Sequence, residues 1–175
     1  GGDVSVTAKS NSVSTVTALP ATTGGAGGSS FGLGAAVAIS LITDDVLAAV
    51  GDGAGLTGAH DLTLLAEQTH LATTQSKIGA SGGGVSITPS VAITLSNVTS
   101  KATVGTGSLL TLTGKLDAKA TLNASAIGNA EGSATTTGSA AIGVALALTI
   151  ANHEVESTTL RDVAAGGLVS FQALG

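Results

Sequence analysis

Apolar and polar residues alternate along most of the chain. Within residues 85–96, one face of an extended strand would carry Val85, Ile87, Val91, Ile93 and Leu95. A period of two is the pattern of a β-strand with one buried face. Glycine, serine and threonine interrupt the alanine-rich stretches every few residues, and they disfavour helices there. The pattern therefore predicts an all-β protein.

The alternating segments recur at an interval of about 54 residues. Two families of segments share this interval: Val37–Leu41, Val91–Leu95 and Leu146–Ile150, and Val4–Ala8, Leu62–Ala66, Leu116–Ala120 and Val169–Ala173. Such self-similarity is typical of stacked units. We therefore expect a single β-solenoid module whose units are roughly residues 1–30, 31–84, 85–138 and 139–175, with the terminal units incomplete.

The repeat pattern leaves the length of one coil open. A unit of this length would hold three coils of about 18 residues or two of about 27 residues. At about 4.8 Å per coil, the stack would be a rod some 30 to 50 Å long.

Large aliphatic residues should fill the interior of such a coil, and glycines should form its corners. The expected inward-facing residues are Val37, Ile39, Val91, Ile93, Leu146 and Leu148. The expected corner glycines are Gly51, Gly53, Gly105 and Gly107.

Composition supports a thin core and excludes several classes of function. Phe31 and Phe171 are the two aromatic residues, so small aliphatic side chains must do the packing, which favours a solenoid over a sandwich. Cysteine is absent, so disulfides and thiolate metal sites are excluded. A net charge of −5 with six scattered basic residues argues against nucleic acid. The apolar runs are shorter than the about 20 residues of a membrane-spanning helix, so membrane insertion is not expected.

Three strings carry a resemblance to a known class of proteins. They are residues 79–93 (GASGGGVSITPSVAI), 102–107 (ATVGTG) and 159–167 (TLRDVAAGG). They resemble the internal repeats of very large bacterial surface and adhesin-like proteins. The resemblance implies an extended extracellular or cell-surface β-solenoid with a structural or adhesive role, and it supplies no catalytic residues.

The best local group of acidic residues is Asp44, Asp45 and Asp52, which offers carboxylate oxygens for Ca²⁺. Val98, Thr99 and Thr106 occupy the corresponding positions of the next unit. Because the repeat does not keep the acids, we expect no calcium-bound stack and no cofactor.

Neither the histidines nor the serines form an evident catalytic motif. His60, His70 and His153 fall opposite other residue types in the repeat, so we expect them at the surface or at corners. Glu154 and Glu156 should share one face, opposite His153, as a paired-carboxylate candidate. No serine lies in a Gly-x-Ser-x-Gly motif, and we expect no enzyme.

Two functional hypotheses follow. The first is a fibre-forming, spacer or adhesive module that assembles end to end through exposed strand edges or with covalent neighbouring repeats. The alternative is a module that binds carbohydrate or ice on a flat threonine- and serine-rich face, suggested by Thr22-Thr23, Thr73-Thr74 and Thr135–Thr137.

Overall fold

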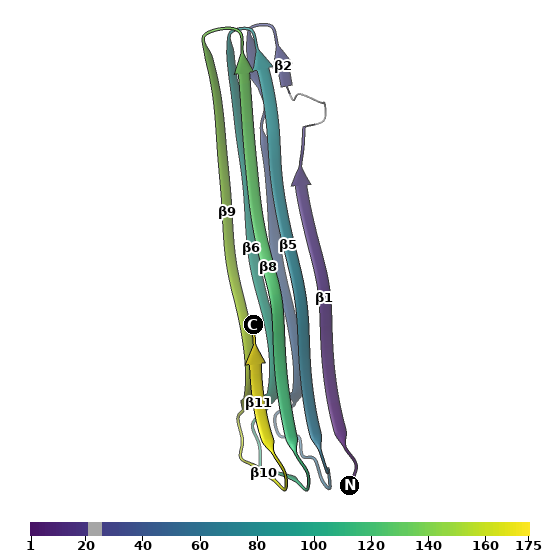
Figure 1. Cartoon of the computed structure of the whole chain (residues 1–175). Coiled ribbons are helices and arrows are strands. Elements are labelled where there is room, and N and C mark those ends of the chain that lie inside the picture. Colours follow the sequence, from purple (N-terminus) through teal and green to yellow (C-terminus); the bar gives the residue numbers. More distant parts are fainter. Residues whose placement is uncertain (21–25) are drawn as a thin grey trace.

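The computed structural model describes residues 1–20 and 26–175, and this part of the chain is built from strands without helices (Figure 1). The strands are β1 (Val4–Ala18), β2 (Ala26–Gly28), β3 (Phe31–Leu33), β4 (Ala36–Val50), β5 (Leu62–Gly82), β6 (Val85–Val104), β7 (Leu110–Leu112), β8 (Leu116–Thr136), β9 (Ala140–Thr159), β10 (Val163–Ala165) and β11 (Val169–Leu174). Among the described residues, none belongs to a helix able to cross a membrane.

The long strands form two facing layers (Figure 1). The first layer contains β1, β2, β5, β8 and β11, and the second layer contains β3, β4, β6 and β9. The chain runs along the first layer, turns and runs back along the second, so each pass contributes one rung of two long strands. The three rungs are β1 with β4, β5 with β6, and β8 with β9. Every strand pairing is parallel.

Paired residues are 53 to 58 positions apart, which confirms the interval inferred from the sequence. Val37 pairs with Val91, and Val91 pairs with Leu146. The expected coil lengths are wrong, however, because one interval forms a single pass out along the first layer and back along the second. The alternation continues through strands of 20 or 21 residues without a corner. Each long strand therefore spans about 65 Å, whereas the three rungs occupy only about 14 Å along the stacking direction.

The two ends of a rung are connected differently. At one end, residues 83–84 and 137–139 join the layers by short turns. At the other end, residues 51–61, 105–115 and 160–168 form longer connections, and β7 pairs with β10 there as a small base sheet. We call these the narrow end and the base.

Large aliphatic side chains fill the space between the layers near the base. This cluster includes Val46, Val50, Leu62, Leu64, Val104, Leu110, Leu112 and Leu116. Phe171 packs against it from β11. The base thus holds an ordinary hydrophobic core.

Towards the narrow end the layers approach so closely that most residues between them are small. A Cβ atom added to Gly132 would lie 2.5 Å from the carbonyl oxygen of Thr88, in the opposite layer. One added to Gly143 would lie 2.5 Å from the carbonyl oxygen of Gly132. Ser90 Oγ donates hydrogen bonds across the layers to the carbonyl oxygen and Oγ of Ser76, at 3.0 and 2.9 Å. Alanine, serine, threonine and glycine therefore predominate in the interior here, and Ile78 of β5, 7% exposed, is a larger exception that packs beside Gly34.

The prediction that six aliphatic residues fill the interior is wrong. Val37, Ile39, Val91, Ile93, Leu146 and Leu148 lie on the outer face of the second layer. Val37 is 58% exposed, whereas Ala38 beside it is 2% exposed. Successive residues of a strand point to opposite faces, so the narrow gap selects the small set for the inside and leaves the large set outside.

The four glycines expected at corners lie in the connections at the base. Gly53 and Gly107 have positive φ values of 70° and 150°. At Gly105 a Cβ atom would lie 2.6 Å from Asp52 Oδ1. Gly51 has open space around its Cα atom.

Substitution of Gly132 tests the close approach of the layers. We expect Gly132→Ala to lower the free energy of unfolding by about 2 kcal/mol, because the new methyl group forces the layers apart. Gly51→Ala, the matched control in open space, should change it by less than about 0.5 kcal/mol. Urea unfolding followed by circular dichroism measures both, and equal effects would contradict the packing described.

Candidate functional site

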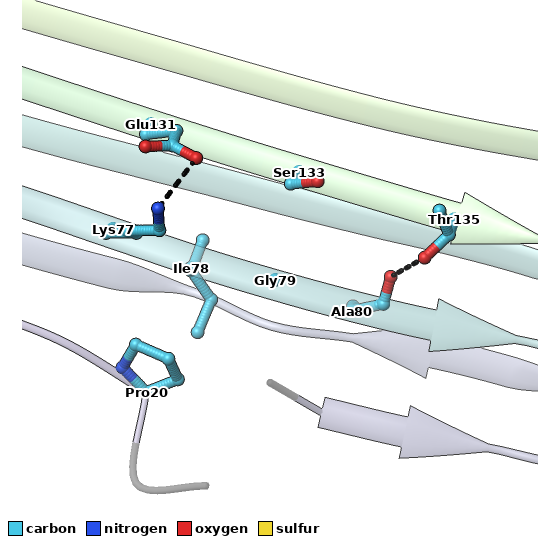
Figure 2. A pocket seen from close by; sticks show the side chains of 8 residues that line it. All are labelled: Pro20, Lys77, Ile78, Gly79, Ala80, Glu131, Ser133 and Thr135. Atoms are coloured by element: carbon cyan, nitrogen blue, oxygen red, sulfur yellow. Dashed lines mark hydrogen bonds and ion pairs between the residues drawn. The ribbon is translucent and has the colours of Figure 1, made fainter. Parts of the chain in front are cut away.

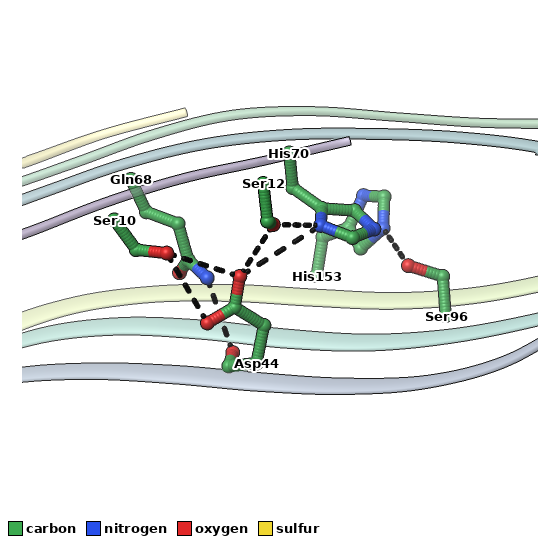
Figure 3. A network of polar contacts seen from close by, with 7 residues as sticks. All are labelled: Ser10, Ser12, Asp44, Gln68, His70, Ser96 and His153. Carbon is green, nitrogen blue, oxygen red and sulfur yellow. Dashed lines mark hydrogen bonds and ion pairs between the residues drawn. The ribbon is translucent and has the colours of Figure 1, made fainter. Parts of the chain in front are cut away.

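A polar cluster lies between the layers at mid-length (Figure 3). It contains Ser10 and Ser12 of β1, Asp44 of β4, Gln68 and His70 of β5, Ser96 of β6 and His153 of β9. All these residues occupy inward positions in their strands. The cluster replaces the aliphatic core of the base with hydrogen-bonding side chains.

Ser12 is the centre of this cluster. Its Oγ donates to Asp44 Oδ2 at 2.6 Å and also lies 2.6 Å from His70 Nδ1. When the Ser12 hydrogen points to Asp44, His70 Nδ1 must be the donor to Ser12 Oγ. His70 is 2% exposed, and its Nε2 has no partner among the described residues.

This arrangement differs from the catalytic set that uses the same three residue types. In serine hydrolases the serine donates to the histidine, and the carboxylate holds the other ring nitrogen. Here the serine lies between the carboxylate and the imidazole, and His70 Nδ1 is 3.8 Å from Asp44 Oδ2. The carboxylate therefore does not orient the imidazole through its second ring nitrogen, as it does in those enzymes, and Ser12 instead helps to satisfy a partly buried carboxylate.

Hydrogen bonds also set the charge state of Asp44. The bond from Ser12, above all, holds the pKa of the Asp44 carboxyl below its usual value, although burial opposes this shift. Ser10 Oγ contributes from 3.3 Å. Gln68 Nε2 donates to the Asp44 carbonyl oxygen at 3.2 Å.

The structure separates the three acidic residues considered for calcium. Asp44 points between the layers, and Asp45 points outwards, where Thr99 Oγ1 donates to it. Asp52 lies at the base and accepts hydrogen bonds from Thr106 N and Oγ1 at 2.7 and 2.8 Å. These bonds from Thr106 lower the pKa of Asp52. Adjacent strand residues cannot converge on one ion from the same side.

Two of the three histidines are inside the stack, so their expected surface positions are wrong. His70 is buried, and His153 Nε2 lies 3.1 Å from Ser96 Oγ on the inward side of β9. His60 lies at an exposed corner as expected.

His60 belongs to a second group of titratable residues. His60 Nδ1 lies 3.1 Å from an oxygen of Asp3 and 3.1 Å from an oxygen of Asp61. Their ligand atoms lie within 4.8 Å of one another, a spacing that would suit a metal ion. The same oxygens already accept backbone hydrogen bonds, Asp3 from Asp61 N and Asp61 from Lys115 N. The group therefore has a structural explanation as a hydrogen-bonded corner.

Glu154 and Glu156 share the outer face of β9, as the alternation predicts. Both pair with Lys101 Nζ of β6, at 2.7 and 3.2 Å. The hydrogen bond to Glu154, followed by that to Glu156, raises the pKa of Lys101. The two carboxylates thus form ion pairs with one lysine of the neighbouring rung.

A hollow of about 360 Å³ lies beside Pro20 on the outer side of the first layer (Figure 2). Lys77 Nζ and Glu131 form an ion pair at 3.0 Å along its wall. Thr135 Oγ1 donates to the Ala80 carbonyl oxygen at 3.3 Å. The polar groups of this hollow therefore interact with one another across β5 and β8.

The threonine pairs do not form a flat array. Thr73 points outwards, whereas Thr74 is 0% exposed. Thr136 Oγ1 donates to the Gly82 carbonyl oxygen at 2.8 Å, on the inward side. Thr22 and Thr23 lie outside the described residues. Since neighbours in a strand face opposite ways, a Thr-Thr pair gives one outward threonine at most.

Apolar side chains cover the outer face of the second layer in its narrow half. The flanking strands expose Phe31, Leu33, Val37, Ile39, Leu41, Ile142, Val144, Leu146, Leu148 and Ile150. Between them β6 contributes half-buried Val85, Ile87, Pro89, Val91, Ile93 and Leu95. We call this surface the apolar face. It ends at Asn97 and Asn152, whose side chains form a hydrogen bond of 2.8 Å.

Arg161 closes the base and was not singled out by the sequence pattern. Its guanidinium donates to the carbonyl oxygens of Gly105, of Ala54 at 2.6 Å and of Gly51 at 2.9 Å. These acceptors belong to the base connections of the two preceding rungs. The side chain thus joins three rungs, and Arg161 is 9% exposed.

Comparison with protein-family models, with curated proteins and with solved structures finds no match to this chain.

The pH dependence of stability should report the role of Asp44. Because its pKa is lowered on folding, the charged carboxylate stabilises the fold above its usual pKa of 3.8, and this contribution is lost as the pH falls through the lower folded value. We expect Asp44→Asn to cost roughly 1–2 kcal/mol at neutral pH, and this difference should disappear in acid.

Asp45→Asn is the control, because it makes the same change of charge on the outer face. Urea unfolding between neutral and strongly acidic pH measures both variants. A loss for Asp44→Asn that persists unchanged in acid would contradict the role assigned to the carboxylate.

Arg161→Lys keeps the charge but removes the planar group that reaches three carbonyl oxygens. We expect a loss of about 2 kcal/mol in the free energy of unfolding, since acceptors at the base lose their donor. Lys115→Ala, at an exposed lysine of the same region, should change stability by less than about 0.5 kcal/mol. Thermal unfolding compares the two variants. If Arg161→Lys is as stable as the unchanged protein, the stabilising role assigned to the three hydrogen bonds of Arg161 is contradicted.

Proposed function

We propose that the chain is a structural β-solenoid module, extracellular or at a bacterial cell surface, that forms fibres by the addition of rungs. The observation that carries this proposal is the unbroken parallel register, in which each residue of a long strand stacks on its counterpart in the next rung. The resemblance of the sequence to repeats of large bacterial surface proteins agrees with it. Each rung is a template for the next.

Strand edges supply the means of growth. In the described structure, β1 and β4 lie at one side of the stack, and β9 lies at the other with β11 covering only Leu116–Thr121 of β8. An unpaired edge presents a row of backbone donors and acceptors. A further rung, from neighbouring polypeptide or from another copy, would pair with these edges in the same register.

The shape favours the display of surface over the spacing of distant parts. One rung uses about 54 residues and adds only about 4.8 Å along the stack. The same rung adds two strands of about 65 Å to the two outer faces. An adhesive or coating role uses such broad faces, whereas a spacer of this chain length would be short.

The polar clusters support a role without catalysis. Ser12, Asp44 and His70 bond to one another between the layers. Asp3, His60 and Asp61 bond to one another at a corner. Catalysis needs polar groups that converge on a substrate, whereas these groups converge on themselves.

Electron microscopy and fibre diffraction of the purified protein test the proposal. We expect filaments about 65 Å wide, the length of a long strand, with a reflection near 4.8 Å along the filament axis. Gly132→Ala should reduce filament formation, because filaments are built from folded rungs. Discrete particles at all concentrations, or more filaments from the destabilised variant, would overturn the proposal.

A further inference from the structure

We propose that the apolar face binds the apolar face of a second copy of this chain, with the strands of the two copies antiparallel. This contact goes beyond the proposed function, which concerns growth through strand edges along the stack. The contact between apolar faces uses side chains instead of backbone groups. Its direction is at right angles to the stacking direction in which rungs would be added.

The area of the apolar face is the first reason. The ten side chains on its flanking strands are 43–74% exposed, and they include Leu41 at 74% and Val37 at 58%. Together with the β6 side chains they present on the order of 1,000 Å² of apolar surface, whereas the largest patch of an ordinary monomer is about 300–600 Å². A standard protein interface buries about 800 Å² on each partner. The face is therefore large enough to form a stable dimer.

The shape of the face is the second reason. Its side chains stand in rows across three strands, such as Ile39, Ile93 and Leu148, because partners in parallel register share a face. When two sheets pack face to face about 10 Å apart, rows of branched aliphatic side chains of this kind interdigitate between them. A second copy presents the same rows, so an isologous contact would bring matching rows of aliphatic side chains against each other.

The composition of the face favours a protein partner over a lipid surface. Phe31 is its one aromatic residue, and the chain contains neither tryptophan nor tyrosine. Those residues, with lysine and arginine, are the usual anchors at a lipid interface. A net charge of −5 also opposes binding to anionic lipids.

Charge fixes the orientation of the two copies. Beyond Asn97 and Asn152 the same outer face carries Asp45, Glu154 and Glu156 against a single Lys101. Parallel strands would place these acidic halves opposite each other, which costs free energy. Antiparallel strands let the apolar halves overlap while the acidic halves extend away on opposite sides.

Two matched lysine substitutions test the contact. Ile39 on the apolar face and Ile127 on the outer side of the first layer are both isoleucines that are 50% exposed. In sedimentation equilibrium, at protein concentrations below those that give filaments, we expect a dimer for the unchanged chain and for Ile127→Lys. Ile39→Lys should weaken the dimer at least about 100-fold, because symmetry buries the charge twice.

Leu148→Lys repeats the test on the other flank, so that the result does not depend on one variant. Far-UV circular dichroism and thermal unfolding identify the folded variants. A monomeric unchanged chain, or equal weakening by Ile39→Lys and Ile127→Lys, would overturn the proposal. Binding of the monomer to neutral phosphatidylcholine vesicles that Ile39→Lys abolishes would also overturn it, since the face would then bind lipid.

Cysteine cross-linking tests the orientation, because the chain has no cysteine of its own. Val91 and Thr103 both point outwards from β6, Val91 within the apolar face and Thr103 near the base. We expect oxidation to link copies of Val91→Cys but not of Thr103→Cys. Efficient linkage through Thr103→Cys would overturn the antiparallel arrangement.

The outcomes separate the two proposals. Dimers are measured by sedimentation and filaments by microscopy. Ile39→Lys should abolish the dimer and leave filaments formed through strand edges. If filaments do not form but the dimer responds to Ile39→Lys, the dimer proposal stands and the fibre proposal fails.

Discussion

The close approach of the two layers towards the narrow end is the constraint on which the rest of the structure depends. At Gly132 and Gly143 the backbones of opposite layers leave no room for even a Cβ atom. Facing sheets normally lie about 10 Å apart, with large side chains interdigitated between them. Here the backbones of the two layers come into direct contact at these points, so most interior residues are glycine, alanine, serine or threonine.

This constraint decides which side chains face water. A strand with strict alternation has one small and one large set of side chains, and the gap admits only the small set. The large set of β4, β6 and β9 is therefore outside, as the exposed side chain of Val37 beside buried Ala38 illustrates. Near the base the layers separate, and leucine and valine return to the interior. The same alternation thus places the large residues outside at the narrow end of a strand and inside at its base end.

The period and the register of the fold could be predicted from the sequence, but the identity of the buried face of each strand could not. The counterparts Val37, Val91 and Leu146 follow from the repeat, and they pair as expected. Alternation defines two faces without saying which is buried, and the usual preference for burying large residues gave the wrong one. The polar groups were missed because their partners lie one rung away: Ser12 meets His70 58 positions later, and Asp52 meets Thr106 54 positions later. A search for complementary residues at the repeat interval of about 54 would have found Asp52 and Thr106, whereas the β1–β5 offset of 58 hides Ser12 and His70 from it.

Strand edges and outer faces differ in the forces they use. An edge adds rungs through backbone hydrogen bonds, which are directional and independent of side-chain identity. In the proposed dimer, the apolar face would be stabilised by burial of hydrophobic area, which grows with the number of rungs. Each rung adds about six outward positions to this face for about 4.8 Å of growth, so lateral attraction rises with every rung that stacks. If both proposals hold, growth along the stack would strengthen association across it, and the polar outer side of the first layer would limit that association to one side.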